Sequence, residues 1–133
     1  MEKRELNENY RKIGTQLIAA MPELAYIRES NVKIAFLQSD YEKKSNGKLV
    51  FAECEKVQDK NKWALQADFT ITLYQKNIEL FSDRQISILI FHELLHVGIS
   101  ERTTGEVAYS IIPHDVEDFK LIIEKFGVDW SEV

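Results

Sequence analysis

ILIFHELLHVG, residues 88–98, sets two histidines and a glutamate inside a run of Ile, Leu, Phe and Val. A charged side chain in such a run is costly to bury unless something compensates for it. Ser82 and Gln85, three residues apart, form a capping box that opens a helix here, and Gly98 is a plausible stop. The spacing of the apolar residues predicts core positions for Ile88, Leu89, Phe91, Leu94 and Leu95.

His92 and His96 are four residues apart on this expected helix. They therefore share one face, separated by roughly 6 Å of rise, and two imidazoles at that spacing can bind one metal ion. Catalytic zinc typically takes three protein ligands and leaves the fourth position to water. His114 is the third and last histidine of the chain, so the sequence predicts a zinc site made of His92, His96 and His114.

The third ligand has alternatives, because carboxylates also bind zinc. The acidic residues near His114 that could replace it are Glu106, Asp115, Glu117 and Asp118. Asp115 or Asp118 could instead orient the imidazole of His114 by accepting its other N–H group. Both acids would equally favour the N-terminus of a helix dipole in the same place.

Glu93 lies beside the two expected ligands and is the candidate general base, then acid. Zinc would lower the pKa of a bound water and polarise a peptide carbonyl. We therefore expect a zinc-dependent peptidase that hydrolyses peptide bonds with a metal-activated water. One alternative is a non-catalytic zinc-binding or protein-interaction module, and another is a structural helix with incidental histidines.

The remainder of the chain predicts one α+β domain over residues 1–133, because this length supports a single core. Apolar residues at helical spacing predict a first helix over residues 3–20 that covers a sheet, and a last helix from His114 to Gly127. Strands are expected at 31–38, 48–57 and 68–75. DFTITLYQ, the third of them, alternates as a half-exposed strand does.

The composition excludes several classes of protein. The net charge is −5 with dispersed basic residues, which argues against nucleic-acid binding. The single cysteine, Cys54, cannot form an internal disulfide, and its apolar neighbours favour a buried position. The N-terminal stretch has no apolar run of the kind that a signal peptide or membrane span needs, so we expect a cytoplasmic protein with no membrane partner. We also expect a monomer that acts on a peptide or protein.

HELLHV (92–97) followed by IPHDVEDF (112–119) resembles the putative phage metallopeptidase family, a zincin-like group distantly similar to SprT-like proteins. The resemblance runs from DFTITLY to the last helix. It implies a minimal zincin-like fold with an N-terminal helix, a small mixed sheet of about three strands, the HExxH helix and a C-terminal helix. It also implies zinc bound by His92, His96 and His114, a catalytic Glu93, and a cytoplasmic location in the host cell for a phage-encoded protein.

Zincin-like folds bind extended peptide along an edge strand before the HExxH helix, and the resemblance implies that DFTITLY has this role. The sequence departs from the metzincin pattern HExxHxxGxxH, because Ile99 and Arg102 stand at the last glycine and histidine positions. It also lacks the zinc-ribbon cysteines of some SprT-like proteins, which argues against a DNA-directed role.

Overall fold

The computed structural model describes residues 1–114 and 118–133. Its α-helices are α1 (Glu8–Ala20), α2 (Ala25–Arg28), α3 (Lys62–Leu65), α4 (Asp83–Leu94) and α5 (Lys120–Phe126). Its strands are β1 (Arg4–Leu6), β2 (Ile34–Ser39), β3 (Lys44–Ser45), β4 (Lys48–Leu49), β5 (Ala52–Lys56), β6 (Phe69–Tyr74), β7 (Val97–Glu101) and β8 (Val107–Ile111). Short 3₁₀ helices are η1 (Pro22–Leu24), η2 (Asp59–Asn61) and η3 (Gln75–Ile78). The expected α+β class is confirmed.

The main sheet has the strand order β1-β2-β6-β5. β2 and β6 run parallel, whereas β1 and β5 pair antiparallel with their neighbours. β6, which contains residues 69–74 of DFTITLY, therefore lies inside the sheet, and the expectation that it is an edge strand is wrong. β5, the part of the predicted 48–57 strand that joins this sheet, is the edge beside β6. A single-sequence pattern does not encode this order, because it depends on pairing between distant segments.

The six residues of β6 are all buried, so the prediction of a half-exposed strand is also wrong. Phe69, Ile71 and Leu73 belong to the hydrophobic core. The alternate residues face the other side, where Arg4 donates hydrogen bonds to Thr72 Oγ1 at 3.4 Å and to the hydroxyl oxygen of Tyr74 at 3.3 Å. The side chains of Thr72 and Tyr74, which point away from the core, are thus buried beneath Arg4 of β1.

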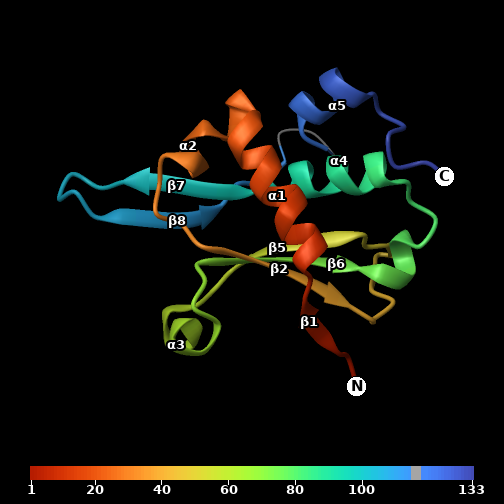
Figure 1. The fold of residues 1–133 in the computed structure, drawn as a ribbon, viewed down its shortest axis with the longest axis horizontal. Coiled ribbons are helices and arrows are strands. Elements are labelled where there is room, and N and C mark those ends of the chain that lie inside the picture. The colour runs from red at the N-terminus through yellow and green to blue at the C-terminus, as the bar shows by residue number, and fades with distance from the viewer. Residues whose placement is uncertain (115–117) are drawn as a thin grey trace.

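Helices α1 and α4 lie side by side over one face of the sheet, and the β7–β8 hairpin extends from the end of α4 (Figure 1). The first helix begins at Glu8, after an Asn7 cap whose side chain accepts the Tyr10 N–H. The predicted start at residue 3 is wrong, because Arg4–Leu6 form β1. The predicted cover of α1 over the sheet is confirmed. Gly14 allows the close approach, because a Cβ there would collide with the ring of Phe36 on β2.

Helix α4 begins with the predicted capping box, since both the Ser82 and Gln85 side-chain bonds are present. Its predicted core residues are confirmed: Ile88, Leu89, Phe91 and Leu94 are buried, and Leu95 packs against the core. The helix ends at Leu94, however, and Gly98 lies within β7. The expectation of a helix up to Gly98 is wrong because the β-branched residues Val97 and Ile99 pair with β8 instead.

The last helix, α5, begins at Lys120, so the prediction that it starts at His114 is wrong. His114 is in a non-helical segment after β8, and residues 115–117 lie outside the described residues. The predicted end at Gly127 is confirmed, and this glycine has the positive φ of 86° that favours its residue type. In the described part of the chain, no helix is long and apolar enough to cross a membrane.

We expect Gly98→Ala to destabilise the hairpin that follows α4. A Cβ at this position would lie 2.7 Å from the backbone oxygen of Ser110, and such overpacking costs about 1–3 kcal/mol of unfolding free energy. Urea unfolding measures the change. Ser100→Ala, at an exposed position of the same strand, is the control and should stay within about 0.5 kcal/mol. Equal stability of Gly98→Ala and the control would show that β8 can move away.

Candidate metal centre

The three histidines of the chain lie together at the end of α4. One nitrogen of each lies within 4.8 Å of the others, and His92, His96 and His114 are the only such metal-capable group among the described residues. The Nε2 atoms of His92 and His114 are 2.8 Å apart. His96 lies two residues after Leu94, the last helical residue, but its backbone N–H still bonds the carbonyl of Glu93 at 3.1 Å. The turn therefore keeps the two rings of the HExxH motif on one side, with centroids 5.3 Å apart.

His96 is held by the start of the segment that carries His114. Its Nδ1 lies 2.6 Å from the carbonyl oxygen of Ile112, and its own carbonyl accepts the Ile112 N–H at 2.7 Å. Nδ1 is therefore the protonated nitrogen, which leaves Nε2 as the metal-binding atom. Burial lowers the pKa of His96 to about 4, so the ring is neutral, as a ligand must be.

His92 is oriented by Asp118. Its Nδ1 lies 2.7 Å from Oδ1 of Asp118, whose other oxygen accepts the indole N–H of Trp130 at 2.7 Å. Burial raises the pKa of Asp118, but the hydrogen bonds from His92 and Trp130 outweigh it and hold the pKa below its ordinary value. Asp118 was expected to orient His114 or to bind the metal, and it orients His92 instead. Asp115, the other candidate, lies outside the described residues.

Glu93 projects into the same place but is only 4% exposed. Its carboxylate lies 3.9 Å from Nε2 of His92 and takes a hydrogen bond from the backbone of Cys54 on β5. Burial raises the pKa of Glu93 to about 7, against the opposing effect of His92. A carboxyl group with this pKa can both accept and release a proton near neutral pH.

Phe119 forms the apolar backing of the site. Its ring centroid lies 5.3 Å from His92, 4.8 Å from His96 and 5.1 Å from His114. At 7% exposure it excludes water from one side of the three imidazoles. Restricting the rings in this way favours one geometry for a bound ion.

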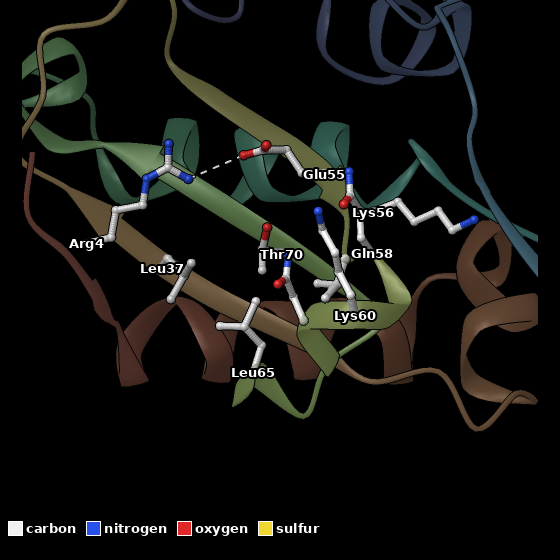
Figure 2. A pocket seen from close by; sticks show the side chains of 10 residues that line it. Arg4, Leu37, Glu55, Lys56, Gln58, Lys60, Leu65 and Thr70 are labelled. Carbon is white, nitrogen blue, oxygen red and sulfur yellow. Dashed lines mark hydrogen bonds and ion pairs between the residues drawn. The ribbon is translucent and has the colours of Figure 1, made fainter. Parts of the chain in front are cut away.

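Two hollows lie on the two sides of β5. The first, about 260 Å³, is lined by the three histidines and by Ala52, Glu53, Cys54, Glu55, Glu93 and Ile111. The second, about 550 Å³, lies on the face of the sheet that carries Leu37 and Thr70, and Arg4 donates to Glu55 at 3.3 Å along it (Figure 2). No histidine lines this larger hollow, so of the two hollows only the smaller one borders the histidine cluster.

The histidines fit a metal ion. In tetrahedral coordination with bonds of about 2.0–2.1 Å, two nitrogen ligands lie about 3.3 Å apart. The nitrogen separations, from 2.8 Å to at most 4.8 Å, bracket this value. Nδ1 of His92 lies 2.7 Å from a carboxylate oxygen and Nδ1 of His96 lies 2.6 Å from a carbonyl oxygen, so Nε2 of each ring would be the atom that holds an ion. Glu106, a third-ligand alternative, instead pairs with Arg102 in the exposed turn of the hairpin.

Comparison with known families agrees with this geometry. The family model described as Putative phage metallopeptidase matches residues 3–133. The chain belongs to this family. The resemblance noted from HELLHV and IPHDVEDF is thereby confirmed, and the match also covers the segments before DFTITLY. No curated protein and no solved structure matches the chain. The family description indicates a metal-dependent peptidase.

Several residues of the centre are missing from the sequence prediction. The sequence does not distinguish Phe119 or Trp130 from other apolar residues that pack in a core. The contact between His96 and the backbone carbonyl of Ile112 cannot be predicted from residue types, because every residue has a backbone carbonyl. Cys54, expected to be buried, is only partly buried against the core, and its backbone forms a hydrogen bond with Glu93 that its residue type does not predict.

Proposed function

We propose that the protein is a zinc-dependent peptidase in which His92, His96 and His114 bind the ion and Glu93 is the general base. The observation that carries the proposal is the convergence of three imidazole nitrogens within 4.8 Å beside a carboxylate that is 4% exposed. Imidazole ligands suit zinc, and three of them leave a tetrahedral ion one open position. When bound, zinc would supply Lewis-acid polarisation of the peptide carbonyl and a more acidic water.

Glu93 would take the proton of the attacking water on its carboxylate and deliver it to the nitrogen of the leaving amine. Its pKa of about 7 suits both halves of this transfer. The Cys54 backbone bond and the burial of the side chain fix the carboxylate close to His92. The protein would thus hold the proton acceptor in place before substrate arrives, which reduces the entropy lost on reaching the transition state.

β5 would align the substrate. It is the edge of the main sheet beside β6, and its residues Ala52–Glu55 line the hollow that contains the histidines. An extended peptide can add to such an edge through main-chain hydrogen bonds, largely independently of its side chains. The role first assigned to DFTITLY therefore passes to the neighbouring strand. We propose a peptide or protein substrate in the cytoplasm.

Metal removal tests the proposal. Protein purified without a histidine tag should contain about one zinc per chain, since three imidazoles make one tetrahedral site with an open position. Its hydrolysis of a mixed peptide library, followed by mass spectrometry, should cease after chelation and return with added zinc. Protein that binds no zinc would refute the proposal, and so would peptide cleavage that survives complete chelation.

A further inference from the structure

The segment after α5 contains a buried tryptophan that the proposed reaction does not use. Trp130 is 9% exposed, and its indole N–H donates to Oδ2 of Asp118 at 2.7 Å. A buried indole usually finds a hydrogen-bond acceptor. Here the acceptor is the same carboxylate that orients the metal-site residue His92, so the end of the chain is one side chain away from a proposed ligand.

Both oxygens of Asp118 are occupied. Oδ2 accepts from Trp130, while Oδ1 lies 2.7 Å from Nδ1 of His92 and accepts the Phe119 N–H, also at 2.7 Å. A carboxylate fixed at both ends cannot rotate away from the imidazole. The position of the His92 ring therefore depends on the indole of Trp130 as well as on Asp118.

Helix α4 itself holds this segment in place through Gln85. The side-chain NH₂ of Gln85 donates to the carbonyls of Glu132 at 2.7 Å and Trp130 at 3.2 Å. Its side-chain oxygen accepts the Ser82 N–H at 2.8 Å as part of the capping box. The first turn of α4 thus fixes the segment, and the segment, through Trp130 and Asp118, fixes His92 in the last turn of the same helix.

We propose that residues 127–133, the C-terminal segment, set the metal affinity of the site, with Trp130 and Gln85 as positioning residues. The inference rests on the proposed zinc site. An acceptor held at Nδ1 keeps the proton there and leaves Nε2 as a lone-pair donor in a fixed direction, and loss of such outer partners typically weakens metal binding about 10–100-fold. Neither residue touches substrate in this scheme.

Trp130→Phe removes the indole N–H and keeps most of the ring volume. Its zinc dissociation constant, measured by competition with a chromophoric chelator, should rise about 10-fold, the low end for an outer partner. Trp63→Phe is the matched control, because Trp63 is 82% exposed on α3, and it should bind zinc as the original protein does. Equal zinc affinity in Trp130→Phe and Trp63→Phe would overturn the inference.

Gln85→Glu loosens the C-terminal segment without altering the packing of Trp130. A glutamate keeps the acceptor for the Ser82 N–H, since Glu is also a capping-box residue, but it loses both donors to the C-terminal segment. We expect weaker zinc binding by a similar factor. Unfolding of the zinc-free forms is measured in parallel, because a loss of stability with unchanged zinc affinity in both variants would mean a purely structural role and would overturn the inference.

A spectroscopic signature separates positioning from general destabilisation. In two-bond ¹H–¹⁵N spectra of the zinc-free protein, His92 should be the Nδ1–H tautomer, and Trp130→Phe should add the other tautomer. An unchanged tautomer with unchanged affinity would contradict the inference. Zinc binding without hydrolysis in the original protein would refute only the proposed function, whereas the absence of zinc binding would refute both.

Discussion

Glu93→Gln is expected to lower kcat/KM for peptide hydrolysis about 10³-fold, within the range of 10²–10⁴ that general acid–base catalysis contributes. The amide has nearly the shape of the carboxylate but cannot accept a proton from water. About 4 kcal/mol of transition-state stabilisation is lost at this factor. The measurement is the initial rate on a peptide that the original protein cleaves.

Zinc should remain bound in Glu93→Gln, because the three imidazoles are untouched. The stability should not fall steeply either, since the substitution replaces a buried carboxyl group whose pKa is already raised to about 7. Glu79→Gln, at an exposed position before α4, is the matched control and should leave both zinc content and hydrolysis unchanged.

The outcomes distinguish the proposed enzyme from its alternatives. Undiminished hydrolysis in Glu93→Gln would remove Glu93 from the mechanism. Zinc bound by both forms, with no cleavage of any library peptide by either, would favour the non-catalytic binding module. Loss of zinc in Glu93→Gln would mean that the Glu93 carboxylate is itself a zinc ligand.

The spacing of the HExxH motif predicted how His92 and His96 lie, although the predicted helix was too long. One turn of local structure sets an i, i+4 pair, and the turn after Leu94 preserves it through the bond from His96 to Glu93. Where the helix ends depends on β7 pairing with β8. Local patterns therefore predict the motif geometry, while the point at which the helix gives way to a strand requires distant partners.

The prediction that DFTITLY is half-exposed was wrong for a related physical reason. Alternation of Phe69, Ile71 and Leu73 with polar residues indicates one buried face, yet Arg4 buries the other face of the same strand.

The partners of Asp118 could not be predicted from the sequence either. An acid four residues after His114 predicted a contact with His114 on a shared helix, but α5 starts only at Lys120, and the carboxylate instead reaches His92.

His114→Ala should abolish zinc-dependent hydrolysis and weaken zinc binding more than 100-fold, beyond the roughly 10–100-fold loss caused by removing an outer partner of a ligand. Two imidazoles on the end of α4 would remain, one fewer than catalytic zinc sites usually have. The zinc-free fold should be little affected, because His114 is exposed. Chelator competition measures the affinity, and unfolding of the zinc-free protein measures the stability.

Glu106→Gln is the control for this substitution, because Glu106 was a candidate third ligand and lies in the exposed turn of the β7–β8 hairpin, ion-paired with Arg102 at 3.7 Å. It should bind zinc as tightly as the original protein.

If His114→Ala also keeps full affinity, an acid must supply the third donor, and the single variants Asp115→Asn, Glu117→Gln and Asp118→Asn would identify it. Because Asp118 already bonds His92 and Trp130, its loss should weaken binding through His92 whichever residue is the third ligand. The Asp115 and Glu117 variants are therefore the decisive pair, and unchanged zinc binding in both, together with a large loss in His114→Ala, assigns the third position to the imidazole.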